Sequence, residues 1–245
     1  MAKDNWKRVA VISDTHGDHI DWEAANHALE AIDDFKPHYR VHLGDFVDLR
    51  AIRKGASDEE KTDGIREDIT EAYKLLDRFG PTHLTLGNHD YRAWSGANNP
   101  KSGMIRDYCY EITRDFEKYF KKNRIKWVPW GSKNVIEIGG FRFLHGYSTS
   151  MYAPKAHAMH YGNCAHGHTH RPNQWRCRHH DKLVGICVGP LCSLNMDYAL
   201  GNMATAEQAH GYLLMRINER TGDFRYSNVI REDDGTWPDF AGGEA

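Results

Sequence analysis

This sequence of 245 residues contains no long hydrophobic run. Near its beginning only residues 9–12 form a short apolar stretch before the chain turns polar, so we expect no signal peptide. No stretch approaches the roughly 20 apolar residues that a membrane-spanning helix needs. A strong charge of one sign is lacking as well. The formal net charge is -2, which excludes a general attraction to nucleic acid or anionic lipid and leaves such binding to a local patch.

Paired cysteines are also lacking. The five cysteines are odd in number and form no Cys-x-x-Cys pair, which argues against a disulfide framework and against a ribbon-type zinc site. We therefore expect free thiols and a reducing, cytoplasmic location. The densest basic stretch, residues 114–126, is interpreted as the solvated face of a helix rather than as a groove for nucleic acid.

Short apolar runs alternate with amphipathic segments in the first half of the chain. The runs end near residues 12, 43 and 86, and helical spacing of apolar residues predicts helices over 21–35, 57–79 and 107–123. Strand and helix in alternation predict an α/β fold with a mostly parallel sheet. In such a sheet the loops after the strands gather at one edge, where ligands bind.

The second half of the sequence is rich in predicted strands. Residues 134–146 indicate a hairpin around Gly139 and Gly140, and residues 211–230 indicate two strands joined near Thr221 and Gly222. The length suits one large domain over residues 1–245. We expect a second sheet packed on the first, with residues 171–245 completing that second sheet and forming a tail.

Metal-binding residue types follow the apolar runs at five places. They are Asp14 and His16; Asp45 and Asp48; Asn88, His89 and Asp90; His145; and His168 and His170. Carboxylates and neutral imidazoles together suit divalent ions such as Zn, Mn, Fe or Ni. One aspartate after a strand is more often a turn former or a helix cap, but five such clusters make coincidence a poor explanation. Asp14 and His16, like His168 and His170, aim at one face only if the local chain is strand-like.

These clusters, read as "DTH", "GDFVD", "GNHD", "HG" at His145 and "GHTH", resemble the five signature blocks of the calcineurin-like metallophosphoesterases. The resemblance covers residues 14–170, and residues 171–245 carry no signature. It implies a four-layer α/β/β/α sandwich with two divalent metal ions at one end of the paired sheets. Manganese is the metal expected in vitro, with Fe, Zn, Ni and Mg as alternatives.

The resemblance also implies a role for each motif residue. One metal takes Asp14, His16, Asp45 and His170, and the other takes Asp45, Asn88, His145 and His168, so that Asp45 bridges. A hydroxide between the metals attacks phosphorus in line. His89 is not a ligand but protonates the leaving oxygen, with Asp48 as its partner. Asp90 supports the ligands, with a simple turn cap as the alternative.

Two departures bear on the substrate. Protein phosphatases of the wider superfamily have an arginine directly after the last aspartate of the second block and a glutamate at the end of the third, where this chain has Leu49 and Asp90. The chain resembles instead the bacterial and phage-type phosphodiesterases, nucleases and small-molecule phosphatases. We expect a diesterase that acts on a nucleotide or another small diester, since the near-neutral charge disfavours long nucleic acid.

Three alternatives stay open: a nuclease on single-stranded or damaged DNA, a phosphomonoesterase, and a non-catalytic metal-binding scaffold. Residues 91–106 are read as a loop beside the site, and Tyr147 lies in the loop after His145. The candidates for substrate contact are Tyr91, Arg92, Asn99 and Tyr147, which offer a cation, an amide and rings for stacking. An ordinary surface loop is the alternative for residues 91–106.

Overall fold

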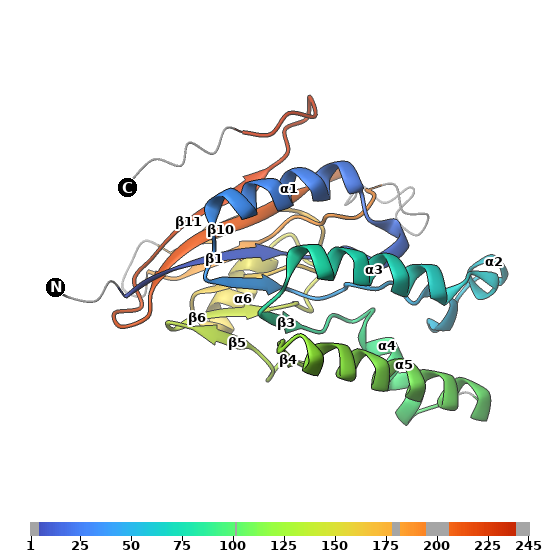
Figure 1. Ribbon diagram of the computed structural model, residues 1–245. Coiled ribbons are helices and arrows are strands. Elements are labelled where there is room, and N and C mark those ends of the chain that lie inside the picture. Colours follow the sequence, from blue (N-terminus) through green and yellow to red (C-terminus); the bar gives the residue numbers. More distant parts are fainter. Residues whose placement is uncertain (1–4, 101, 178–181, 195–205, 239–245) are drawn as a thin grey trace.

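A computed structural model describes residues 5–100, 102–177, 182–194 and 206–238 and contains two mixed sheets flanked by helices (Figure 1). The larger sheet has the order β11-β10-β1-β2-β3-β4, in which β1 to β4 are parallel, β10 is antiparallel to β1, and β11 is antiparallel to β10. Its strands are β1 (Trp6–Ile12), β2 (Tyr39–His42), β3 (His83–Thr85), β4 (Lys126–Val128), β10 (Gly211–Asn218) and β11 (Phe224–Ile230). The predicted α/β class is confirmed.

The smaller sheet has the order β5-β6-β7-β9-β8, and its central strands β6, β7 and β9 are parallel. Its strands are β5 (Ile136–Ile138), β6 (Phe141–Leu144), β7 (Cys164–His166), β8 (Asn173–Arg176) and β9 (Val184–Cys187). The predicted hairpin around Gly139 and Gly140 is present as β5 and β6, which pair antiparallel.

The segment after residue 170 contributes strands to both sheets. We expected it to complete the second sheet, and β8 and β9 do lie there, but β10 and β11 extend the first sheet instead. The reason is visible in β10, which is buried on both faces. Leu213 and Met215 pack between the sheets, whereas Tyr212 and Leu214 pack toward α1 (Trp22–Phe35). A strand that is buried on both faces suits an internal position in a sheet. β10 has such a position between β1 and β11.

Helices cover the outer faces of both sheets, which makes the predicted four-layer α/β/β/α sandwich (Figure 1). On the first sheet lie α1, α3 (Ile65–Phe79) and α5 (Gly103–Lys122), and α6 (Ala153–Tyr161) packs on the second. Between the sheets, alternate apolar side chains of both inner faces form one continuous core. The described helices include none that is long and apolar enough to span a membrane.

The helix predicted over residues 57–79 is divided into two helices in the structure. Ser57 and Glu60 form a reciprocal capping box at the start of α2 (Asp58–Thr62), and the chain restarts after Gly64 as α3. Two further helices lie where we predicted loops: α4 (Tyr91–Asn98) and α6. Both are short and weakly patterned. α4 packs closely on α5, because a Cβ at Gly96 would lie 2.5 Å from the sulfur of Cys109.

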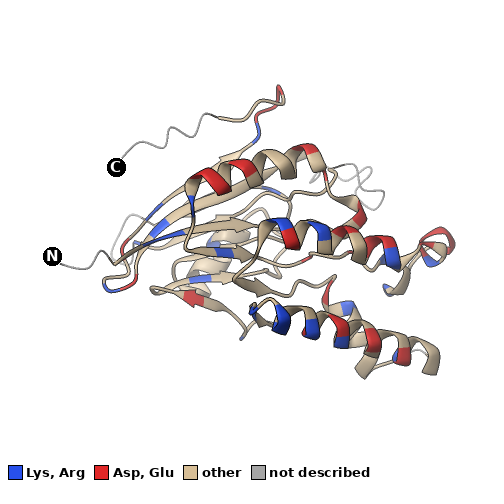
Figure 2. Ribbon diagram, in the orientation of Figure 1, with Lys and Arg blue, Asp and Glu red and all other residues tan. Residues whose placement is uncertain are grey.

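Charged residues of both signs alternate along α3 and α5 (Figure 2). On α5 the basic residues of the predicted solvated face are exposed, and two of them pair with acidic residues one turn earlier. Arg114 lies 3.6 Å from Glu111, and Lys118 lies 3.2 Å from Asp115. All five cysteines are free thiols, as expected. The cytoplasmic location stays a prediction.

Candidate metal centre

The loops that follow β1, β2, β3, β6 and β7 meet at one end of the two sheets. Backbone hydrogen bonds fasten the first two loops together, since the amides of Asp14 and His16 donate to the carbonyls of Gly44 and Asp45 at 3.0 and 2.9 Å. The amide of Gly167 donates to the carbonyl of His145 at 3.0 Å in the second sheet. The structure therefore brings all five sequence motifs to one place.

The candidate ligands converge through left-handed backbone, not through strand-like pairs. Five of them have positive φ angles: Asp14 (49°), His16 (50°), Asp45 (51°), His168 (71°) and His170 (57°). Non-glycine residues rarely adopt this region, and such conformations gather at functional sites where the surrounding structure holds them. The condition that Asp14 and His16, or His168 and His170, aim at one face only in a strand-like chain is wrong for this reason.

A first set of donor atoms lies around His16 and His170. Their Nε2 atoms are 3.2 Å apart, and Nε2 of His170 is 3.4 Å from Oδ1 of Asp14. Nε2 of His16 lies 4.0 Å from the same oxygen and 3.9 Å from Oδ2 of Asp45. All four side chains are buried. Two imidazoles and two carboxylates thus converge at a place that is shielded from solvent. Such a donor set is typical of a divalent cation site.

A second set lies on the other side of Asp45. Nε2 of His145 is 3.0 Å from Oδ1 of Asn88 and 3.2 Å from Oδ2 of Asp45. Nδ1 of His145 lies 2.9 Å from the carbonyl of Leu43, so Nδ1 carries a proton and Nε2 is turned toward the other donors. A ring nitrogen of His168 lies within 4.8 Å of the donor atoms of His145 and Asp45. Asp45 thus faces both sets.

The charges at this centre are unbalanced without a cation. Burial disfavours the ionised form of Asp45, but His145, His89 and His16 outweigh it and hold the pKa of that carboxyl well below its usual range. Burial likewise opposes a charge on His145, yet Asp45, Asp14 and Asp90 together raise the pKa of its imidazole to about 9. A proton on His145 thus occupies a position that suits a cation, and the donor chemistry of both sets fits divalent metal ions.

His89 contacts Asp48 and Arg92 beside the two donor sets. Its Nδ1 contacts Oδ1 of Asp48, and Nη2 of Arg92 lies 3.2 Å from its Nε2. A guanidinium can only donate, so the proton of His89 is on Nδ1 and the lone pair of Nε2 faces Arg92. Burial lowers the pKa of His89, and the neighbouring cation Arg92 adds to this effect. The predicted pair with Asp48 is present, but the imidazole is held neutral instead of charged.

Asp48 is shared between His89 and the first donor set. Burial opposes its ionised form, but hydrogen bonds with His16 and His89 hold the pKa of this carboxyl far below its usual range. Its Oδ1 lies 3.4 Å from Nδ1 of His16, whose other ring nitrogen faces the donor set. A carboxylate behind a ligating histidine fixes the ring orientation and makes the free nitrogen a better donor. His89 could itself be a donor, because a ring nitrogen of His89 lies within 4.8 Å of a ring nitrogen of His16 and a carboxylate oxygen of Asp45.

Asp90 joins two of the loops through its carboxylate. It accepts the backbone amides of Gly87 at 2.7 Å, Asp45 at 2.7 Å and Val47 at 3.1 Å. The side chain does not cap α4, which begins at the next residue. A Cβ at Gly87 would lie 2.1 Å from Oδ1 of Asp45, so only glycine lets these loops approach so closely.

Two residues of this centre escaped the sequence analysis. Asp68 in α3 is buried and accepts the amides of Asp48 at 3.0 Å and Leu49 at 2.7 Å. An aspartate on the apolar face of an amphipathic helix, between Ile65 and Ala72, was the available signal. Cys192 lies beside His16 and His170, and its sulfur is within 4.8 Å of their ring nitrogens.

The four candidates for substrate contact lie in different places. Tyr91 and Arg92 begin α4 directly after the third motif. Asn99 is exposed beyond the other end of that helix, roughly 12 Å along its axis. The hydroxyl group of Tyr147 donates to that of Tyr161 at 2.9 Å. Of the four, Arg92 is the one with a side-chain contact to His89 and Asp48 among the described residues.

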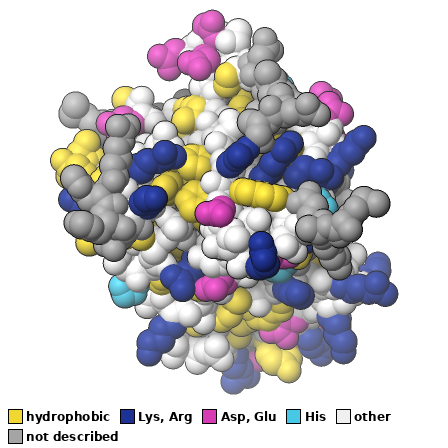
Figure 3. All heavy atoms as spheres, turned by 90° about the vertical axis from the view of Figure 1, so that its left-hand side faces the viewer, with side chains coloured by type: hydrophobic (Ala, Val, Ile, Leu, Met, Phe, Trp, Pro, Cys, Tyr) yellow, Lys and Arg dark blue, Asp and Glu magenta, His cyan; other side chains and the backbone are white. Residues whose placement is uncertain are grey.

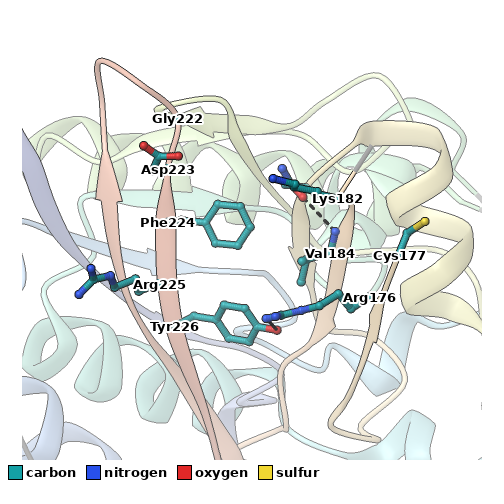
Figure 4. Close-up of a pocket in the computed structure, with 10 residues that line it drawn as sticks. Arg176, Cys177, Lys182, Val184, Gly222, Asp223, Phe224, Arg225 and Tyr226 are labelled. Atoms are coloured by element: carbon teal, nitrogen blue, oxygen red, sulfur yellow. Dashed lines mark hydrogen bonds between the residues drawn. The ribbon is translucent and has the colours of Figure 1, made fainter. Parts of the chain in front are cut away.

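A cleft of about 740 Å³ lies at the other end of the sheets, between the β10–β11 hairpin and strands β8 and β9 (Figure 4). Phe224 and Tyr226 point across it toward Val184 and Arg176. Lys and Arg side chains outnumber acidic ones on this end of the molecule (Figure 3). Phe224 pairs with Ile217 near the beginning of β1, roughly 20 Å along the strand from the loops described above. This cleft is separate from the donor sets.

The five motifs lie within a stretch of the chain that matches a known protein family. A profile of the calcineurin-like phosphoesterases matches residues 7–184, which include every motif from Asp14 to His170. The Gene 54 protein of Mycobacterium phage D29 is 26% identical over 239 residues, which cover 86% of this chain and 89% of that protein.

Two solved structures of bacterial proteins match this chain over most of its length. YfcE, a phosphoesterase from E. coli, has a TM-score of 0.38 and 14% identity, with 90% of this chain and 98% of that chain covered. A phosphatase from Mycoplasma pneumoniae has a TM-score of 0.46 and 11% identity, with 92% and 94% covered.

Proposed function

Because this chain belongs to the calcineurin-like phosphoesterase family, we propose that it hydrolyses phosphodiesters of nucleotides or other small molecules at a centre of two divalent cations. The observation that carries the proposal is that two sets of buried donor atoms meet at Asp45. A protein that only binds a partner has no need for this arrangement. Nor does it need His89 and Asp48, which are paired beside the donors.

The donor sets assign the residues that would hold each cation. One site takes Asp14, His16, Asp45 and His170, the other Asp45, Asn88, His145 and His168. Two divalent cations bound there would neutralise phosphate oxygens and make water a nucleophile near neutral pH. Mn fits the oxygen and imidazole donors, as do Zn, Fe, Ni and Mg to different degrees. Asp90 and Asp68 hold the loops that carry these donors.

Arg92 and His89 act on the substrate. In the described state Arg92 donates to Nε2 of His89, which blocks the nitrogen that must carry the proton for the leaving oxygen. A phosphate oxygen beside Arg92 accepts the guanidinium hydrogen bond and frees this nitrogen. The negative charge of the phosphate also favours protonation of the imidazole. His89 then donates from Nε2 to the leaving oxygen while Asp48 holds Nδ1.

The small number of arginine side chains near His89 supports a preference for diesters over monoesters as substrates. Arg50 pairs with Asp18 and Asp63, at 2.6 Å in each case, so its charge is already compensated. Arg92 has a looser ion pair, 3.5 Å from Oδ1 of Asp48, and among the described residues it is the guanidinium that lies against Nε2 of His89. Beside the two metal cations, one added guanidinium suits the single negative charge of a diester, whereas a monoester carries close to two near neutral pH.

We expect the metal-stripped protein, reloaded with Mn, to hydrolyse bis(p-nitrophenyl) phosphate with a kcat/KM at least tenfold above that for p-nitrophenyl phosphate. The release of p-nitrophenolate reports both rates, and a sample left without metal is the control. A preference for the monoester would direct the search to small phosphatase substrates. No turnover of either ester with two metals bound would contradict the proposal and favour the scaffold.

Metal uptake by the stripped protein should tighten as the pH rises toward 9. The pKa of His145 is raised to about 9, so below that pH the metal must displace its proton, and the pKa of His168 is lowered to about 4 by burial, so it needs no such displacement. One displaced proton gives up to a tenfold gain in affinity per pH unit below 9. Competition with a chelator at pH 6.5, 7.5 and 8.5 measures this gain. An unchanged affinity over this range would rule out His145 as the competing base.

A further inference from the structure

Cys192 is a buried thiol at the edge of the first donor set. Its sulfur lies within 4.8 Å of the ring nitrogens of His16 and His170, and these nitrogens are themselves 3.2 Å apart. Zinc binds nitrogen at about 2.1 Å and sulfur at about 2.3 Å, so two such donors on opposite sides of one ion lie up to about 4.4 Å apart. The three atoms are therefore placed almost as ligands of a single cation.

The segment around Cys192 is fastened to the loop that carries the first donors. The amide of Leu191 donates to the carbonyl of Asp14 at 3.2 Å, and the amide of Ser193 donates to that of His19 at 2.7 Å. The backbone of Cys192 itself pairs with that of Ile20 in an isolated antiparallel β-bridge. Hydrogen bonds thus hold the chain on both sides of Cys192 against the loop that carries Asp14 and His16.

The other cysteines have surroundings that account for them without a metal. Cys164 packs with the apolar residues beneath α6, and Cys109 packs against Gly96. Cys187 is buried, but its sulfur lies 3.1 Å from the hydroxyl group of Thr169. Among the described residues, Cys192 is the cysteine that lies within ligand distance of two imidazoles.

We propose that Cys192 supplies a sulfur ligand to the cation held by Asp14, His16, Asp45 and His170. This inference rests on the two-cation centre of the proposed function and makes its two sites unequal. The site with sulfur selects Zn, Fe or Co over Mn and Mg, because thiolate is a soft ligand. The second site has only oxygen and nitrogen donors and accepts Mn. The protein then holds a mixed pair of metals.

Cobalt absorption tests this assignment directly. The stripped full-length protein is loaded with Co²⁺ to two equivalents, and we expect a near-ultraviolet band from charge transfer between thiolate and cobalt. The band should be lost in Cys192→Ser and kept in Cys177→Ser, the same change at a partly exposed cysteine at the end of β8. A band that survives Cys192→Ser, or a wild type with two bound cobalt ions and no band, would overturn the assignment.

Two further measurements separate this proposal from the proposed function. Bound cobalt, counted by elemental analysis and by its visible bands, shows whether the centre exists at all, so failure to bind cobalt contradicts the two-cation centre itself. Cadmium-113 NMR of the wild type needs no variant. One resonance in the range of sulfur ligation and one in the range of oxygen and nitrogen ligation are expected, and two of the latter kind would refute the sulfur ligand.

Discussion

Asp45→Asn should abolish diester hydrolysis, with a loss of at least about 10³-fold in kcat, and should reduce the bound metal from two ions per chain to one or fewer. Oδ2 of Asp45 lies 3.2 Å from Nε2 of His145 and 3.9 Å from that of His16, so this carboxylate is the anion that both donor sets share. Two divalent cations about 4 Å apart repel by roughly 16 kcal/mol at an effective dielectric constant near 20. A neutral amide cannot offset that repulsion.

The measurement is metal content by elemental analysis, with turnover of bis(p-nitrophenyl) phosphate determined on the same samples. Asp115→Asn makes the same chemical change on the exposed face of α5 and should change neither quantity. The variant should keep its fold, because the amide still fills the space of the carboxylate, and circular dichroism checks this. Two metals and full activity in Asp45→Asn would refute a shared carboxylate.

The location of this centre could be predicted because polar residues directly after buried strands have few other uses. Asp14, Asp45 and Asn88 each follow an apolar run, and in a parallel sheet the ends of such runs meet. The parallel order β1-β2-β3 confirms this step of the argument. The pairing of His89 with Asp48 followed from the family resemblance alone, since no periodicity relates residues 41 positions apart.

The remaining features depend on contacts that local pattern does not contain. The left-handed backbone at Asp14 and His170 arises from packing between loops, because neither residue favours that conformation as strongly as glycine. The position of β10 between β1 and β11 depends on which strands it pairs with. Its alternation of buried side chains would suit either sheet and does not identify these partners. Cys192 reaches the donors through hydrogen bonds that join segments far apart in the sequence.

His89→Ala should leave two metals bound but lower kcat for a dinucleotide by about 10² to 10⁴-fold, the usual contribution of a general acid. The loss should be much smaller for bis(p-nitrophenyl) phosphate, because p-nitrophenolate leaves without a proton whereas a nucleoside alkoxide needs one. His160→Ala, on the exposed side of α6, is the matched control.

The comparison of the two substrates also decides between the two readings of His89. Its ring nitrogen is near enough to His16 and Asp45 to be a ligand, and a ligand's loss would remove metal and slow both substrates equally. The loss of a general acid leaves the metal content intact. The resulting reduction in kcat grows with the basicity of the leaving group. The contact of Nδ1 with Asp48 and the position of Arg92 at Nε2 favour the acid, because both ring nitrogens already have partners other than a cation.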